Sequence, residues 1–293
     1  MHLIKLMLLC FCIHYPAAGT LSGFPVRSIQ SAPQQEYDSL LDISYGEAPG
    51  NDNLMDIHLP KERNSNTKVI VYIHGGSWIR GDKKEFPLML VNELAGKRKY
   101  VVASINYRLV KEGKNIFPSQ IDDVKKALAF LRAKAGEWKY DTTSFALMGA
   151  SAGAHLALLY AYGYDSLKQV KTVVDIFGPT DLSDKLIRSK GTESNAIIEN
   201  FLATNDTAAQ IVKEASPLFH LNKRTGVPTL IFHGTGDELV PVSQSEKLYA
   251  QLKSLQIPSS LELYPGEKHE LRPEIAVSLF GKIISWFGTY FPE

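Results

Sequence analysis

One serine of this sequence stands in a pattern that suits nucleophilic catalysis. Ser151 is the centre of Gly149-Ala-Ser-Ala-Gly153, which follows a short apolar run and directly precedes a helical pattern. A serine on a sharp turn between a strand and a helix needs small neighbours, because its backbone is strained and adjacent chain crowds it. We therefore predict that Ser151 is a nucleophile. A small-residue turn that only packs the helix is the alternative.

A serine hydroxyl needs a base to take its proton and a carboxylate to hold that base. For a serine on this kind of turn, the acid and then the histidine follow along the chain. Six of the eight histidines lie beyond residue 19: His58, His74, His155, His220, His233 and His269. We predict His269 as the base, because it lies in a loop after the last predicted strand and before the last predicted helix. An exposed loop histidine is the alternative, and His155, one helical turn after Ser151, is predicted to pack inside its helix.

The acid is expected in the loop after the preceding predicted strand. That loop reads His233-Gly-Thr-Gly-Asp237-Glu238, and its two glycines allow a close turn that directs a carboxylate toward the base. We predict Asp237 as the acid, with Glu238 as its neighbouring rival. A second rival pairs His233 with Asp175 or Asp181, but it places the base at the end of a strand instead of on a loop.

The negative charge that develops on an attacked carbonyl oxygen needs preorganised donors, usually backbone N–H groups. One is expected from Ala152, the residue after the nucleophile, and the other from the loop after an early strand. That loop is His-Gly-Gly-Ser-Trp at residues 74–78, where glycines let the backbone approach a substrate. We predict Gly75, Gly76 and Ala152 as the oxyanion hole, with Ser77 as an alternative to Gly76.

The two bulky residues of the same loop have other expected roles. His74 is predicted to orient the loop, and Trp78 is predicted either to line an acyl site or to pack in the core. This chemistry uses no metal ion and no organic cofactor, so we predict neither.

The elements that position these residues follow from hydrophobic patterning. Residues 68–73 form an almost continuous β-branched run, which is typical of a strand buried on both faces of a parallel sheet. Further strands are predicted at residues 41–45, 54–59, 100–105, 145–148, 172–176, 229–232 and 261–264, and helices at 120–135, 152–162, 243–255 and 273–291. This alternation predicts an α/β fold with a doubly wound, mostly parallel sheet and helices on both of its faces.

Residues 180–225 interrupt the alternation, since they contain short helical pieces and no clear strand. Two interpretations stay open, a small cap over the carboxyl edge of the sheet and ordinary surface helices between two strands. We predict one α/β domain at residues 37–293, preceded by a linker at residues 20–36.

The first 19 residues have the layout of a secretory signal, with one cation, an apolar stretch and a small-residue end. Cleavage near Ala18 or Gly19 would remove both cysteines, Cys10 and Cys12. It would also remove Lys5, so the full chain's 32 Lys and Arg against 31 Asp and Glu become 31 against 31 in the mature chain. We predict a secreted or periplasmic protein without a transmembrane span in the mature chain. The net charge is close to zero and the sequence contains no long basic run, so nucleic acid is not an expected partner.

The motifs together resemble the α/β-hydrolase superfamily, and more narrowly the small H-G-G-x-W carboxylesterases related to hormone-sensitive-lipase-like, feruloyl-esterase-like and kynurenine-formamidase-like enzymes. The resemblance covers residues 40–291 and is carried by residues 74–78, 105–108, 122–128, 149–158, 177–181, 233–241 and the loop of His269. It implies an elbow nucleophile at Ser151, an acid at Asp237, a base at His269 and oxyanion donors at Gly75, Gly76 and Ala152.

The resemblance implies a serine carboxylesterase that acts through an acyl-enzyme on a small-molecule or polysaccharide-linked ester, for example an acetyl or feruloyl ester. An aryl formamidase and a small serine peptidase use the same machinery and stay open as alternatives. A hydrolase-fold binding protein without catalysis is a further hypothesis, which the complete set of motif residues disfavours.

Overall fold

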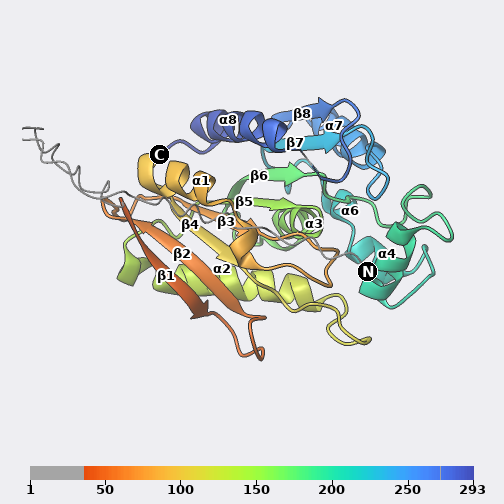
Figure 1. Ribbon diagram of the computed structural model, residues 1–293, viewed down its shortest axis with the longest axis horizontal. Helices are drawn as coiled ribbons and strands as arrows, with labels where there is room; N and C mark the ends of the chain where they lie inside the picture. The colour runs from red at the N-terminus through yellow and green to blue at the C-terminus, as the bar shows by residue number, and fades with distance from the viewer. Residues whose placement is uncertain (1–35, 271) are drawn as a thin grey trace, which may run out of the picture. The chain divides into compact units, whose positions relative to one another are not determined.

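The computed structural model describes residues 36–270 and 272–293, and the framework of this part is an eight-stranded sheet (Figure 1). The strands are β1 (Tyr37–Ser44), β2 (Leu54–Pro60), β3 (Val69–Ile73), β4 (Val101–Ile105), β5 (Phe145–Ala150), β6 (Val170–Ile176), β7 (Thr229–Gly234) and β8 (Ser259–Tyr264). Their order is β1-β2-β4-β3-β5-β6-β7-β8. The six strands from β3 to β8 pair in parallel, whereas β1 and β2 run antiparallel at one edge.

The central strands are buried on both faces, as their β-branched runs predict. Every residue of β3 is buried, and the same holds for β4 and β7. Alternate residues of β3 belong to two different hydrophobic clusters, one on each face of the sheet, as Val71 and Tyr72 do. The predicted doubly wound, mostly parallel α/β sheet is therefore confirmed.

Helices cover both faces of the sheet. On one face lie α2 (Ser119–Trp138), α3 (Ala152–Leu159, extended by a π-helical turn at Tyr160–Tyr164) and α7 (Ser243–Ser254). On the other face lie α1 (Leu88–Val91) with the π-helical turn Asn92–Lys97, and α8 (Pro273–Tyr290). Figure 1 shows α2 and α8 on opposite sides of the sheet.

The segment between β3 and β4 contains structure that the sequence did not predict. A 3₁₀ helix at Lys83–Glu85 precedes α1 and its π-helical turn, in a segment for which no element is predicted from the sequence. These pieces are too short to show a helical hydrophobic period, and Pro87 and Gly96 lie within the segment as apparent breakers. Packing of Leu90, Val91 and Leu94 against the sheet stabilises them instead.

Residues 180–225 contain three short helices and no strand: α4 (Glu193–Leu202), α5 (Gln210–Glu214) and α6 (Pro217–His220). Phe201 and Val212 are fully buried and belong to the same hydrophobic cluster as the sheet. The segment therefore contributes to the main core and has no separate core of its own.

The predicted signal peptide at residues 1–19 and residues 20–35 of the predicted linker lie outside the described residues. Among the helices that are described, none is both long and apolar enough to cross a membrane.

Candidate active site

Ser151 lies on the turn between β5 and α3, with φ 53° and ψ −119°. A positive φ is uncommon for a residue other than glycine and marks a strained turn that its surroundings must hold. The surroundings are tight, because a Cβ on Gly153 would lie 2.0 Å from the carbonyl oxygen of Ile73 in β3. The small residues around the serine thus allow α3 to begin directly against the central strand.

The structure brings Ser151, His269 and Asp237 together from three separate loops. Nε2 of His269 lies 2.8 Å from Oγ of Ser151, and Nδ1 lies 2.6 Å from Oδ2 of Asp237. Asp237 follows β7, and His269 follows β8. When Nδ1–H donates to the carboxylate, Nε2 carries the lone pair that accepts the serine proton. This is the arrangement that a general base requires.

Asp237 is buried and receives more hydrogen bonds than the one from His269. The backbone N–H groups of Leu239 and Val240 donate to its Oδ1 at 2.9 and 2.8 Å, and Nε2 of His233 lies 3.3 Å from its Oδ2. Burial alone would raise the pKa of Asp237, but hydrogen bonds from His233 and His269 outweigh it and lower the pKa below its usual value. The carboxylate therefore stays ionised at neutral pH.

Among the described residues, no hydrogen bond joins Ser151 to any of the rival residues. Glu238 is exposed, although it is adjacent to Asp237. His233 is fully buried, where its Nε2–H donates to the carbonyl of Val240 at 2.8 Å and its Nδ1 lies 2.7 Å from Oγ of Ser245. Asp175 accepts a hydrogen bond from the N–H of Gly178. Among the hydrogen bonds of the described residues, none joins His233 to Asp175 or Asp181.

The loop at residues 74–78 lies directly against the serine turn. A Cβ on Gly75 would lie 2.9 Å from the carbonyl oxygen of Ala150, so the two backbones approach closely. Gly76 has φ +101°, and a Cβ there would lie 2.2 Å from the carbonyl oxygen of Arg80. Only glycine fits this position without strain.

The N–H of Ala152 is at the start of α3, where the first N–H groups of a helix have no acceptor within the helix. The predicted oxyanion residues Gly75, Gly76 and Ala152 thus lie around Ser151. Ser77, the alternative donor, has φ 57° and lines the same space.

Contacts with Tyr107 hold the loop at residues 74–78 in place. The hydroxyl of Tyr107 donates to the carbonyl of His74 at 3.0 Å, and the two rings stack with centroids 4.3 Å apart. His74 is buried, and its Nδ1 lies 2.8 Å from the carbonyl oxygen of Gly75. Tyr107 belongs to residues 105–108, which carry the resemblance, but no role was predicted for it. It lies two residues after the end of β4, at the same carboxyl edge of the sheet as Ser151.

Trp78 both lines a cavity beside Ser151 and packs in the core. Its indole stacks on Phe201 of α4, with ring centroids 4.0 Å apart, and meets the ring of His155 edge-on at 5.0 Å. His155 is fully buried, and burial lowers its pKa to about 4, so its ring is neutral. Its Nε2–H donates to the carbonyl of Ala215 at 2.7 Å. Trp78 and His155 thus connect α3, the helix that follows Ser151, to residues 180–225.

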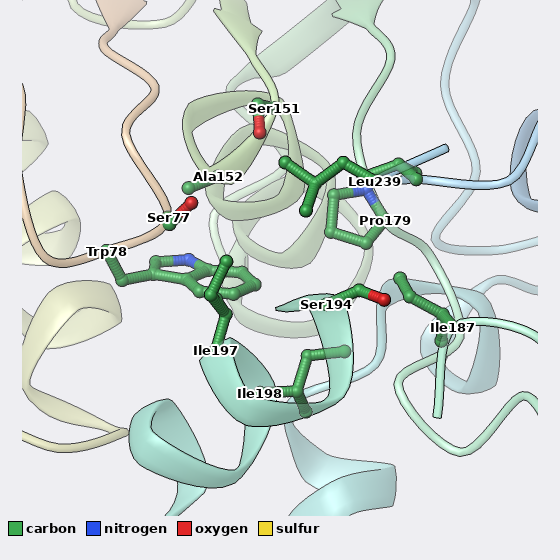
Figure 2. A pocket seen from close by; sticks show the side chains of 11 residues that line it. Ser77, Trp78, Ser151, Ala152, Pro179, Ile187, Ser194, Ile197, Ile198 and Leu239 are labelled. Carbon is green, nitrogen blue, oxygen red and sulfur yellow. The ribbon is translucent and has the colours of Figure 1, made fainter. Parts of the chain in front are cut away.

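Two hollows meet at Ser151. The first is narrow and mostly apolar, with a volume of about 20 Å³, and lies between Trp78 and α4 (Figure 2). The second is open and has a volume of about 310 Å³. Its lining includes His269 and the charged residues Arg80, Glu85 and Glu270. Within the described part of the chain, no group of three or more His, Cys, Asp or Glu residues could hold a metal ion.

Residues 55–252, more than half of the chain, match the BD-FAE family; the matched range includes Ser151 and Asp237 and ends before His269. Among curated proteins, the chain is 29% identical over 256 residues to the probable carboxylic ester hydrolase LipM of Mycobacterium tuberculosis, covering 82% of this chain and 58% of that protein. It is 28% identical to the esterase LipC of the same organism, covering 73% of this chain and 55% of that protein. The chain therefore spans little more than half the length of these relatives.

Among solved structures, a truncated carbohydrate esterase from gut microbiota superposes with a TM-score of 0.70 at 23% identity, covering 86% of this chain and 98% of that one. A bifunctional GH43-CE protein of Bacteroides eggerthii superposes with a TM-score of 0.74 at 24% identity, covering 86% of this chain and 38% of that one. At this level of identity the likeness concerns the fold. From the family match and this fold, the chain belongs to the BD-FAE family and has the α/β-hydrolase fold.

Proposed function

We propose that this protein is a serine carboxylesterase with Ser151 as nucleophile, His269 as general base and Asp237 as the acid that orients the base. The observation that supports this most is the continuous hydrogen-bonded chain from the Ser151 hydroxyl through His269 to the ionised Asp237. The names of the related carboxylic ester hydrolase and esterase agree with this chemistry.

In the proposed mechanism, Nε2 of His269 takes the proton of Ser151 as Oγ attacks the ester carbonyl. The N–H of Ala152 and an N–H from Gly76 or Ser77 stabilise the oxyanion, and one such donor typically contributes about 3 kcal/mol to the barrier reduction. His269 then gives its proton to the leaving alcohol, which leaves an acyl group on Ser151. A water molecule activated by His269 hydrolyses this acyl-enzyme.

We further propose a secreted enzyme whose alcohol is part of a sugar, with an acetyl or feruloyl group as the acyl part. The charged residues Arg80, Glu85 and Glu270 in the open hollow beside His269 can hydrogen-bond sugar hydroxyl groups. The carbohydrate esterase among the similar structures is compatible with such a substrate. Secretion is supported by the signal-like pattern of residues 1–19.

The test compares the purified protein with Ser151→Ala in hydrolysis of p-nitrophenyl acetate. We expect the variant to lose activity by at least about a thousandfold, because the attacking oxygen is absent. Equal rates for both proteins would overturn the proposal. Acetylated xylan, methyl ferulate and N-formylkynurenine then separate a carbohydrate esterase from an aryl formamidase.

A further inference from the structure

The two hollows at Ser151 are suited to bind different parts of an ester substrate, its alcohol part and its acyl part. His269 must pass its proton to the leaving oxygen, so the alcohol has to lie on the side of Ser151 where His269 lies. That side is the open hollow with Arg80 and Glu270. The narrow hollow between Trp78 and α4 lacks His269 and includes Ala152, so it is the place for the acyl group.

The acyl side is much the smaller of the two. Its volume is about 20 Å³, against about 310 Å³ on the alcohol side. A cavity needs about 10–15 Å³ to hold one water molecule, so the narrow hollow has room for a group of roughly that size. The methyl of an acetyl group meets this limit. A butyryl chain or a feruloyl ring exceeds it.

Two isoleucines of α4 limit the depth of this hollow. Figure 2 shows Ile197 and Ile198 projecting from α4 on the side of the cavity away from Ser151. Ile198 is 2% exposed, whereas Ile197 is partly exposed. Both residues lie within residues 180–225, the segment between β6 and β7.

The walls of the hollow are anchored, so they resist displacement by a longer chain. The rings of Trp78, Phe201 and His155 all contact one another, and Phe201 is fully buried. The backbone N–H of Phe117 donates to the carbonyl of Phe201 at 2.9 Å, which fixes the end of α4 to the segment before α2. Enlarging the hollow would therefore break packing in the main core, which is costly.

We propose that the enzyme is an acetyl esterase whose Ile197 and Ile198 exclude longer and aromatic acyl groups. This inference rests on the proposed serine carboxylesterase function and decides between its acetyl and feruloyl forms. The acyl specificity is set by residues 180–225, whereas the alcohol is bound by the open hollow.

The test measures kcat/KM for p-nitrophenyl acetate, butyrate and ferulate, so that the leaving group stays constant. The proteins are the wild type, Ile197→Ala, Ile198→Ala and the control Ile211→Ala. Ile211 is a partly buried isoleucine of the same segment that does not line the hollow. Melting temperatures accompany the rates, because Ile198 is buried and its truncation costs stability; the partly exposed Ile197 provides the second, less disruptive variant.

We expect the wild type to prefer acetate to butyrate by at least about tenfold, since a misfit of one or two methylene groups changes rates by roughly 10–200-fold. Ile197→Ala or Ile198→Ala should lower this preference by about tenfold, and Ile211→Ala should leave it unchanged. Equal wild-type rates on acetate and butyrate, or a preference that neither variant lowers, would overturn the acetyl inference and leave the esterase proposal standing. If the wild type hydrolyses none of these esters faster than Ser151→Ala does, both the esterase proposal and the acetyl inference are overturned.

Discussion

Asp237 is the residue on which most polar contacts of the site converge. One oxygen accepts hydrogen bonds from the N–H groups of Leu239 and Val240, and the other lies near both His233 and His269. The carboxylate is thereby held in one orientation and in its ionised form. His233 contacts Asp237 and not Ser151, so we propose it as a positioning residue that acts through Asp237.

The first prediction concerns Asp237→Asn. The amide cannot hold His269 in the tautomer that accepts the serine proton, so we expect kcat on p-nitrophenyl acetate to fall by about 10⁴-fold. Glu238→Gln removes the neighbouring exposed carboxylate and is the matched control, with an expected change of less than about twofold. A larger loss in the control than in Asp237→Asn would assign the acid to Glu238 instead.

The second prediction concerns Asp175, which is fully buried and has no hydrogen-bond partner for Oδ2 among the described residues. Burial raises its pKa to about 7, although the N–H of Gly178 and the nearby His233 partly oppose this. Because the pKa of Asp175 is higher in the folded protein than in the unfolded chain, where it is about 3.9, its contribution to the free energy of unfolding is fully present below pH 3.9. This contribution is lost as the pH rises through 7.

Asp175→Asn removes this titration. Relative to the wild type, we expect the free energy of unfolding of the variant to increase by about 3 kcal/mol between pH 5 and pH 8. Urea unfolding of both proteins at the two pH values measures this change. A difference between the proteins that is independent of pH would show that Asp175 keeps an ordinary pKa.

At the residue scale, chain order and the loops that follow the strands predicted that Ser151, Asp237 and His269 meet, with Glu238 left open as a rival acid. Ser151, Asp237 and His269 follow different strands of one parallel sheet, whose carboxyl ends share an edge. The contacts of His233 and Tyr107 could not be predicted in the same way, because they depend on the exact depth and direction of buried side chains. No local pattern in the sequence contains that information.

Among the elements, the close approach of α3 to β3 positions Ser151, the proposed nucleophile. Gly153 lies against the carbonyl of Ile73, and Gly149 lies against Gly153. The helix can therefore start directly at the end of β5, which leaves Ser151 on the turn. A larger residue at either glycine would push the helix away from the sheet.

The third prediction tests this approach with two Gly→Ala changes. Gly153→Ala places a methyl group 2.0 Å from the Ile73 carbonyl, so we expect a loss of about 3 kcal/mol of stability together with reduced activity. Gly136→Ala, in α2, meets no atom within 4 Å and should instead stabilise by about 0.5–1 kcal/mol, because alanine favours the helix. Urea midpoints measure both. Similar effects of the two changes would contradict the role of close packing at Gly153.

The central strands were predictable because they are buried runs of β-branched and apolar residues, as in Val69–Ile73, whereas β1 and β8 at the two edges are only partly buried. The short helices at residues 83–97 were not, because tertiary packing stabilises them and they have no hydrophobic period of their own. The two interpretations of residues 180–225 could not be separated either, since the burial of Phe201 depends on Trp78, which is far away in sequence.

At the scale of the whole described chain, one hydrophobic cluster joins the sheet, the helices of one face and residues 180–225. Leu147 of β5, Leu156 of α3 and Phe201 of α4 all belong to it. A segment that shares the main core in this way cannot unfold without exposing that core. We propose residues 37–293 as a single domain on this basis.

The fourth prediction is that this domain unfolds in one step. Tryptophan fluorescence reports on Trp78, which packs against residues 180–225, and on Trp138 and Trp286, whereas far-UV circular dichroism reports on the sheet and helices together. We expect the same urea midpoint from both probes. An earlier fluorescence transition in the wild type that disappears in Trp78→Phe would show that residues 180–225 unfold separately.

The central claim is that Ser151 forms an acyl-enzyme. The most direct measurement is mass spectrometry of the protein quenched in acid shortly after mixing with p-nitrophenyl acetate. We predict a mass gain of one acetyl group on the wild type, located to the peptide that contains Ser151, and no gain at that peptide in Ser151→Ala. Turnover of the ester by the wild type with the acetyl group on another residue, or with the Ser151→Ala variant equally active, would contradict the account.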